Sequence, residues 1–524
     1  MIQNQLCKVT KYLTESAKSS CRSAAKRFGL SKSSVSRHQQ KIEARSEIRG
    51  ASFFETEDGQ TWILEFVVAS IMIFGILCGV GSDRIALFIS LLKLNHFAGL
   101  SASSLREIES QIDKIIIQYK NTYDAEVKEN CKDVEVVIGA DETFLAKIMC
   151  LVLMDLKSGF VFTEEIKERR DHATWSEVSR PWTDGFNNIK SFLSDRAKAL
   201  LKLSKDTLLK NRVADLFHIM NRISSVMKFS FDRKYKSLQN QLKDLEDKAR
   251  KGCRIRARII DLKRLIPQVL CDKKRYQKHL RRLSISLHPF KVLSNIRETS
   301  GGVNRRMQSS LSEIKQIKEE HNVSDKSKKM NGLVKEIESA SSNVDEWWSW
   351  VDNSLNSAEI LPEFRQWLSS HLLPYYYWKN AIGKSSSKLI NRFYEISFKN
   401  CASKIKIHPD YSLESIDQKW IDWAETFSTL FVRTTSALEG RNQWITQTHY
   451  NGRGLTSERL KSQTAMRNYF LEDQSGRTPC EKLTKIKPEC LFQYILKNID
   501  QLKQPRIGKN MQLPQTLVYQ GVPA

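Results

Sequence analysis

The strongest constraint on the fold is a short β-rich region inside a chain whose remaining pattern is mostly helical. Residues 134–166 contain three runs rich in Val, Ile, Leu and Phe, separated by short turns. A fourth apolar run, IKSFLSD, ends at Asp195, and residues 211–215 favour a short fifth strand. From about 230 to 425 the apolar residues keep helical spacing. We therefore predict an α/β (α+β) unit with one small sheet, interrupted by a large all-helical segment.

The charge balance favours a polyanionic partner. The 524 residues include 84 Lys and Arg against 59 Asp and Glu, a net charge of +25. Such a surplus repels itself unless it meets a polyanion, and each phosphate of a nucleic acid that is neutralised releases counterions. Nucleic acid is the first interpretation. A membrane surface or simple solubility are the alternatives.

The cysteines and the apolar stretches point to a reducing, aqueous compartment. Ten cysteines include no CxxC pair, which argues against zinc fingers, and they are too sparse for a disulfide framework. The N-terminus has no apolar core of a signal peptide. The longest uncharged stretch, residues 66–82, contains three glycines and is short for a membrane span of about 20 residues. We expect a buried helix there, with a membrane helix as the alternative.

Residues 20–42 have the pattern of a helix-turn-helix. A short amphipathic helix around Ala24–Phe28 meets Gly29, and a Ser at 31 precedes a second helix that starts near Lys32. Such a second helix enters the major groove of DNA. A plain helical hairpin is the alternative. The residues expected on the exposed, DNA-binding face of the second helix are Ser33, Ser34, Ser36, Arg37 and His38.

The same pattern recurs further along the chain. A helix from Asp83 ends near Gly99, and Ser101 caps the next helix. This segment fits a second helix-turn-helix and a helical packing domain equally well.

Two aspartates end apolar strands. Asp141 follows the first run in VVIGADETF, and Asp195 follows the fourth in FLSDRAKAL. If the first and fourth strands are neighbours, the two carboxylates lie side by side and repel each other unless divalent cations bridge them. A third acid from a later helix would complete a two-metal site for phosphoryl transfer. Asp215 is the rival second aspartate, although a helix N-cap is its simpler interpretation.

Glu439 in TSALEGRNQWITQ is the best third acid, with Glu425 and Glu472 as rivals. The small and polar residues that follow Glu439 let its helix approach a phosphate backbone. We expect Glu142 to be a supporting or solvent-facing residue, Asp155 a turn residue and His218 a packing or supporting residue. The flanking residues expected to contact DNA are Arg441, Asn442, His449 and Arg453.

Two further features lie in the helical segment. Residues 248–282 hold 14 Lys and Arg against two acids, so we expect sequence-independent DNA affinity there, or a merely solvated helix pair. The aromatic clusters WWSW at 347–350 and YYYW at 375–378 favour core packing. A platform that stacks an unpaired base is the alternative.

Several of these motifs, taken in their order along the chain, are similar to those of a known protein family. ADETF, SDRAKAL, DLFH and TSALEGRNQ, followed by HYNGRGL, resemble a bacterial insertion-sequence transposase of the RNase H-like DDE superfamily. The resemblance covers roughly residues 15–475 and is weak in the helical middle. The 244 residues (439 − 195) that separate Asp195 from Glu439 are many for this superfamily, but members with an all-helical insertion before the glutamate helix exist.

The resemblance implies an activity, cofactors and partners. It implies cleavage at transposon ends and strand transfer by in-line attack, with Asp141, Asp195 and Glu439 as catalytic residues and ligands of two Mg²⁺ ions, for which Mn²⁺ can substitute. Double-stranded DNA, as transposon ends and as target, is the expected partner of a homo-oligomer in the bacterial cytoplasm, at the nucleoid and without a membrane. A domesticated, inactive DNA-binding descendant and a helical scaffold are the alternatives.

The resemblance also sets the expected division of the chain into regions. The expected regions are a helix-turn-helix arm at 1–50, a helical domain at 51–128, an RNase H-like core in two parts at 129–229 and 426–480, an all-helical insertion at 230–425, and a tail at 481–524.

Overall fold

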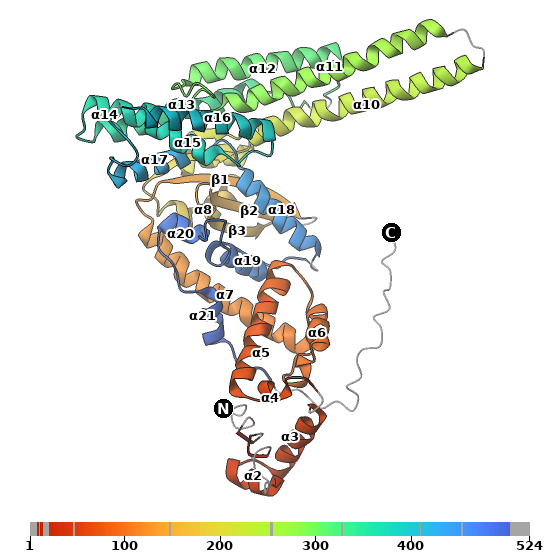
Figure 1. The fold of residues 1–524 in the computed structure, drawn as a ribbon, viewed down its shortest axis with the longest axis vertical. Helices are drawn as coiled ribbons and strands as arrows, with labels where there is room; N and C mark the ends of the chain where they lie inside the picture. The colour runs from red at the N-terminus through yellow and green to blue at the C-terminus, as the bar shows by residue number, and fades with distance from the viewer. Residues whose placement is uncertain are drawn as a thin grey trace.

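The protein has a mixed α/β fold that is largely helical around one five-stranded sheet (Figure 1). The computed structural model describes residues 8–9, 11–13, 20–45, 48–145, 148–251, 255–325, 328–408, 410–451 and 454–503, without the side chains of 42–44.

The sheet has the strand order β3-β2-β1-β4-β5. β1, β2 and β3 run antiparallel, whereas β4 and β5 run parallel to β1. The expected five strands and the neighbouring position of the first and fourth strands are therefore confirmed. The strands are β1 Val136–Leu145, β2 Ile148–Asp155, β3 Val161–Lys167, β4 Ile189–Ser194 and β5 Arg212–Ala214.

Helices cover both faces of the sheet, because successive strand side chains point to opposite faces. Val136 and Ile138 belong to a core shared with α7 (Ala102–Asn130) and α8 (His172–Thr183). Val137 and Leu193 belong to a second core shared with the helical segment. At the β2 and β3 end of that second face, a smaller core includes residues of α18.

The segment between β5 and α18 is entirely helical where the structure describes it. In Figure 1, α10 and α11 form a long hairpin that projects beyond the rest of the molecule. The expected boundary at 229/230 falls inside α10. The helices are α10 Leu216–Arg250, α11 Arg256–Ser286, α12 Ser300–Glu320, α13 Leu333–Asn356, α14 Pro362–Trp367, η4 Leu368–Leu372, α15 Leu373–Ala381, α16 Lys388–Lys406 and α17 Gln418–Leu430.

The aromatic clusters of this helical segment belong to its core. Trp347, Trp348 and Trp378 are at most 2% exposed, and Tyr377 is buried with them. Core packing, rather than a platform for an unpaired base, is therefore the role of these four rings.

At the N-terminal end, α2 (Cys21–Phe28) and α3 (Lys32–Arg45) meet at Gly29, whose φ of 62° is the left-handed cap that favours glycine. Ser31 accepts a hydrogen bond from the Ser34 backbone at 3.1 Å, which is a capping contact. The placement of His38 on the exposed face is wrong. His38 lies one helical turn after buried Val35 and is itself buried.

A helical unit joins this hairpin to the sheet. It consists of α4 Ala51–Phe54, α5 Glu57–Ser70, η1 Ile71–Leu77, α6 Ser82–Leu91, η2 Leu94–His96 and α7. The continuous helix Glu57–Leu77 is long and apolar enough to cross a membrane by length and composition, with a mean hydropathy of 1.9 over its best window. Ile63, Val67 and Val68 are buried against the α7 core, so the expected buried helix is found on one side, whereas Trp62 and Phe74 are exposed.

After the helical insertion the chain returns to the sheet. α18 (Ser436–Asn451) lies beside β1, and α19 (Ser457–Tyr469) packs against β3 and α7 (Figure 1). Two short helices, α20 (Pro479–Thr484) and α21 (Leu491–Asn498), complete the described chain. Segments more than 200 residues apart in sequence thereby form one unit.

Candidate metal centre and adjoining cavity

Strand register brings the two aspartates together. Ala140 of β1 pairs with Ser194 of β4 in parallel register, and Asp141 and Asp195 are the next residues on each chain. Backbones of neighbouring strands lie about 4.7–4.9 Å apart, so both carboxylates emerge at one edge of the sheet. Asp195 Oδ1 accepts a hydrogen bond from the Ala197 backbone at 2.9 Å, which holds this carboxylate at the strand end.

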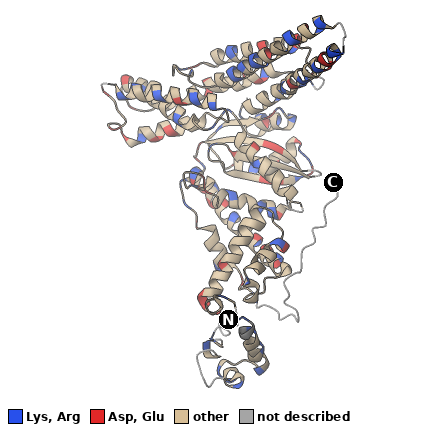
Figure 2. Ribbon diagram, turned by 45° about the vertical axis from the view of Figure 1, so that its right-hand side comes forward, with Lys and Arg blue, Asp and Glu red and all other residues tan. Residues whose placement is uncertain are grey.

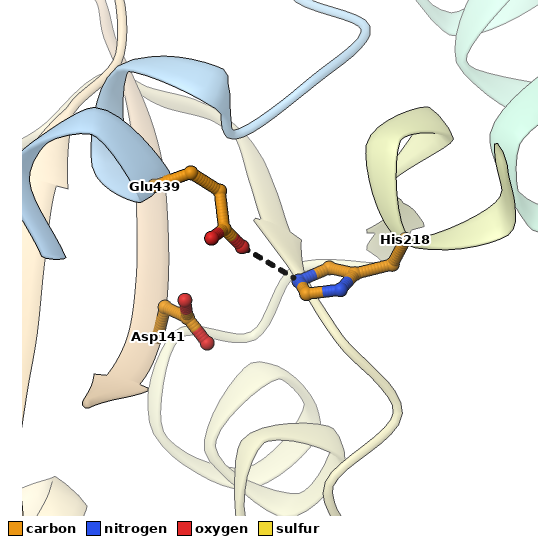
Figure 3. A group of neighbouring side chains, drawn as sticks. All are labelled: Asp141, His218 and Glu439. Carbon is orange, nitrogen blue, oxygen red and sulfur yellow. Dashed lines mark ion pairs between the residues drawn. The ribbon is translucent and has the colours of Figure 1, made fainter. Parts of the chain in front are cut away.

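Two residues from distant helices, His218 and Glu439, join Asp141, whereas Asp195 is not part of this group of potential ligands. Asp141, His218 and Glu439 each offer one ligand atom, and these three atoms lie within 4.8 Å of one another (Figure 3). His218 comes from the first turn of α10 and Glu439 from the first turn of α18. His218 Nε2 lies 3.5 Å from Glu439 Oε1 and 3.6 Å from Asp215 Oδ2. The sequence predicted the two acids of this cluster, but not the histidine.

The charges of the cluster are strongly coupled. Burial, and then the negative charge of Glu439, raises the pKa of Asp141 to about 7, against an ordinary value of 3.8. Burial and the nearby Asp215 raise the pKa of Glu439. Asp195 adds to the upward shift of both carboxyls, which places its charge within electrostatic range of the cluster. A divalent cation would relieve this repulsion.

Asn442 fixes the orientation of Asp141. It follows Glu439 by three positions on α18, and its Nδ2 donates to Asp141 Oδ2 at 2.7 Å. Asn442 Oδ1 is buried and has no hydrogen-bond donor among the described residues. A water molecule bound to a metal ion would supply the donor that this oxygen lacks.

The donor set fits a divalent cation. Carboxylate oxygens suit Mg²⁺ and Mn²⁺, whereas imidazole suits transition metals better than Mg²⁺. Asp141, Asp195 and Glu439 are therefore the residues that would hold Mg²⁺ or Mn²⁺. His218 either adds a nitrogen ligand for a transition metal or, when protonated, compensates the charge of the carboxylates.

Asp215 ties the two helices of the site together. Its Oδ1 accepts from the Phe217 backbone at 2.8 Å, which is the expected N-cap of α10. The same carboxylate accepts from the Thr435 backbone at 3.2 Å and from the Thr435 hydroxyl at 2.5 Å. Thr435 immediately precedes α18, so one buried carboxylate fixes the first turns that carry His218 and Glu439.

Arg433 joins this junction to the core of the helical insertion. Its guanidinium donates to His288 Nε2 at 2.8 Å, to Tyr394 Oη at 3.2 Å and to the Ser284 carbonyl at 3.2 Å. Burial, and then the charge of Arg433, lowers the pKa of His288 well below its ordinary value, so the imidazole stays neutral and accepts. Contacts with the helical insertion therefore fix the position of the segment that leads into α18.

Two expected DNA contacts on α18 have other surroundings. Arg441 is 3% exposed and forms a buried, two-pronged ion pair with Glu164 of β3, at 2.5 and 2.6 Å. A DNA contact by Arg441 is therefore wrong, because its donors are used inside the protein. His449 is half-buried, with its Nδ1 buried and unpaired among described groups, and Arg453 lies outside the described residues.

The remaining acids are accounted for. Asp155 accepts from the Val137 and Ser158 backbones and is the expected turn residue. Glu142 is a supporting residue that pairs with Arg170 at 2.6 Å. The rivals of Glu439 are Glu425, exposed on α17, and Glu472, exposed after α19, and neither is part of the metal-ligand cluster.

A cavity of about 970 Å³ opens beside the cluster, with Asp195 and His218 on its wall. Its other walls come from the start of α8, the segment Arg196–Lys202, the second turn of α10 and the start of α13. Sequence reasoning did not predict this cavity. The short α9 (Lys198–Lys202) that lines it has too few residues for a periodic signal.

Residues 368–511 match a family described as a family of unknown function (DUF6399). The match spans η4 to α21, including Glu439 and Asn442, and leaves out the strands that carry the two aspartates. No curated protein matches the sequence.

Proposed function

We propose that the protein is a DNA transposase of the RNase H-like DDE type, which binds transposon ends and catalyses strand cleavage and strand transfer. The observation that carries the proposal is the convergence of Asp141 and Glu439 at the edge where β1 and β4 lie side by side, with Asp195 next in register. The position of β1 beside β4 in the sheet, and the return of α18 to β1 after a long insertion, also support the proposal.

The residues of the site have separable roles. When bound by Asp141, Asp195 and Glu439, two Mg²⁺ or Mn²⁺ ions supply the charge stabilisation that phosphoryl transfer requires. Asn442 holds the Asp141 carboxylate in one orientation, and Asp215 holds the helix that carries His218. His218 Nε2 lies 3.6 Å from Asp215 and 3.5 Å from Glu439, so a protonated ring would offset part of the negative charge of these two carboxylates.

DNA binding is assigned to surfaces outside the metal centre. The α2–α3 hairpin presents Ser33, Ser34 and Arg37 as exposed residues, and Ser36 is partly exposed. A helix of this kind reads base edges in the major groove. We propose that it recognises the transposon ends, and that the protein acts as a homo-oligomer on DNA at the bacterial nucleoid.

The projecting α10–α11 hairpin supplies sequence-independent affinity. Figure 2 shows many Lys and Arg along this hairpin. Some are already paired, such as Lys263 with Glu246 at 2.8 Å and Arg275 with Glu313 at 3.0 Å. Six exposed cations of α11 form no ion pair with a described residue: Arg256, Arg258, Arg264, Lys274, Lys278 and Arg282.

The test is a cleavage assay with the full chain and DNA that carries the ends of the element. Asp195→Asn and Glu439→Gln keep the shape of the side chains and remove their charge, so DNA binding should remain and cleavage should be lost. Glu425→Gln on exposed α17 is the control. Mn²⁺ should replace Mg²⁺, whereas Ca²⁺ should support binding without turnover because it is larger and looser in geometry.

Asp215→Asn decides the ligand assignment. If it abolishes cleavage while Asp195→Asn stays active, Asp215 is the second ligand and Asp195 is not. If the wild-type chain binds DNA but none of the divalent ions tested supports cleavage, the proposal gives way to the alternative of a DNA-binding protein that has lost catalysis.

A further inference from the structure

The cavity beside the metal centre carries more positive charge than its own carboxylates balance. Five cationic and four carboxylate side chains line it. Its volume of about 970 Å³ lies at the upper end of the roughly 300–1,000 Å³ of ligand pockets, and it is too small to take in a DNA duplex. Since Asp195 and His218 form part of the wall, a molecule in the cavity would lie next to these two residues.

Two of the five cations are already paired with cavity carboxylates. Arg170 Nη1 lies 2.6 Å from Glu142 Oε2. Arg196 Nε lies 3.6 Å from Glu336, which also pairs with Arg212 at 2.9 Å. The charges of Glu142 and Glu336 are therefore already compensated, and they do little to balance the other cations of the cavity.

The other three cations form no ion pair with a described carboxylate, and the two remaining carboxylates of the lining are Asp171 and Asp195. Lys198 and Lys202 are exposed, lie one helical turn apart on α9, and have no described carboxylate within 4.0 Å. Arg222 donates to the backbone carbonyls of Lys329 and Asn331, at 2.8 and 2.5 Å. Those carbonyls fix the position of the guanidinium but leave its charge unneutralised.

We propose that this cavity binds the phosphate backbone of a single nucleic-acid strand, with Lys198, Lys202 and Arg222 as its phosphate contacts. The proposal rests on the proposed function and adds a strand-binding site to it. Lysine binds phosphate as a point charge, and two lysines one turn apart can meet successive phosphates. Among the described residues of the lining there is no Phe, Tyr or Trp on which a base could stack, and its only rings are those of His172 and His218, so we expect the site to hold the backbone without reading sequence.

The experiment compares two matched pairs of substitutions in the full chain. Lys198→Gln/Lys202→Gln removes the pair on α9. Lys388→Gln/Arg392→Gln removes an equally exposed pair, also one turn apart, on α16 outside the cavity. The probe is a labelled single-stranded octamer of thymidine, dT8, and its binding is followed by fluorescence anisotropy over a range of salt concentrations. Thermal melting confirms that both variants fold.

The expected result is specific to the cavity pair. Each lost phosphate contact should reduce the slope of log K, where K is the association constant for dT8, against log salt concentration by about 0.7. The slope of the α9 double variant should therefore be smaller by about 1.4. Near 0.1 M salt this corresponds to binding that is roughly 25-fold weaker. The α16 pair should bind dT8 as the wild type does.

Three results would overturn the strand site. These are an unchanged slope for the α9 pair, an equal loss for both pairs, and α9-dependent binding of ATP or pyrophosphate together with α9-independent binding of dT8. The last result would identify a small phosphate ligand instead. Failure of the proposed function is seen separately, as the absence of metal-dependent cleavage by the wild-type chain, because the dT8 titration needs neither metal nor turnover.

Discussion

The raised pKa of Asp141 predicts that the metal-free protein is destabilised as the pH rises. Asp141 is neutral in the folded protein up to about pH 7 but ionises near 3.8 in the unfolded chain. The folded state therefore holds a proton that the unfolded state has released. The stabilisation from this group is complete below about pH 4 and is lost as the pH rises toward 7 and above.

The size of the effect follows from the shift. Each pKa unit corresponds to 1.36 kcal/mol, so a shift of about three units amounts to roughly 4 kcal/mol. This is an upper bound, because the Asp141 side chain is only partly buried and keeps some contact with water. Between pH 5 and pH 8 the expected loss is roughly 2–3 kcal/mol.

The perturbation is Asp141→Asn, which removes the ionisation and keeps an oxygen that can accept from Asn442. Urea unfolding in EDTA, followed by tryptophan fluorescence, gives the free energy of unfolding of both proteins from pH 5 to pH 8. The advantage of the variant should grow by roughly 2–3 kcal/mol over this range. Glu425→Gln, an exposed carboxyl on α17, should show no such growth.

A divalent cation should reverse the effect. At pH 8, Mg²⁺ or Mn²⁺ at about 100 times its dissociation constant should stabilise the wild-type protein by roughly 2.7 kcal/mol, and Asp141→Asn far less. A difference between variant and wild type that is the same at every pH would refute the reasoning. It would show that the Asp141 carboxyl is not forced toward its neutral form by the cluster.

Other predictions follow from the same contacts. His218→Asn should slow cleavage and leave DNA affinity unchanged in an anisotropy titration, because the ring lies beside two carboxylates and is not one of the proposed phosphate contacts. Arg433→Lys loses the forked donors that hold the junction before α18, and should lower the melting temperature and the rate of cleavage together. Neutralising four of the unpaired cations of α11, Arg256, Arg258, Arg264 and Lys274, should reduce the salt slope for duplex DNA by up to about 3.6, whereas a solvated helix pair would leave it unchanged. Deleting residues 1–50 should abolish recognition of the transposon ends but preserve the melting transition of the rest.

The local sequence pattern was enough to predict the sheet and the two acids of the metal-ligand cluster, Asp141 and Glu439. The apolar runs of residues 134–166 form strands because their residues are β-branched or bulky, and Ser158 and Gly159 form the turn between β2 and β3. Asp141 and Asp195 could be placed because a residue that ends a strand emerges at the sheet edge whatever surrounds it. Glu439 could be placed because the small residues around it permit a close approach to the sheet.

Contacts between distant segments account for what was missed. His218 joins the acids because Asp215 binds Thr435, which lies 220 residues further along the chain. Arg441 has the sequence surroundings of a surface cation, yet its partner Glu164 is 277 residues away on the inner face of β3. No local pattern specifies either pair, since each depends on where the insertion returns the chain.

The insertion also has a consequence for the order in which the protein is made. Asp195 and Glu439 are separated by 244 residues (439 − 195), which a ribosome adds in about 12–50 s at roughly 5–20 residues per second. During that interval the growing chain has the α2 and α3 helices, which we propose to bind DNA, and both aspartates, but it lacks the glutamate. A chain that stopped inside the insertion would occupy DNA without cutting it and would compete with finished copies. Under the proposed function, the chain therefore cannot cleave DNA until α18, the last helix of the site, has been synthesised.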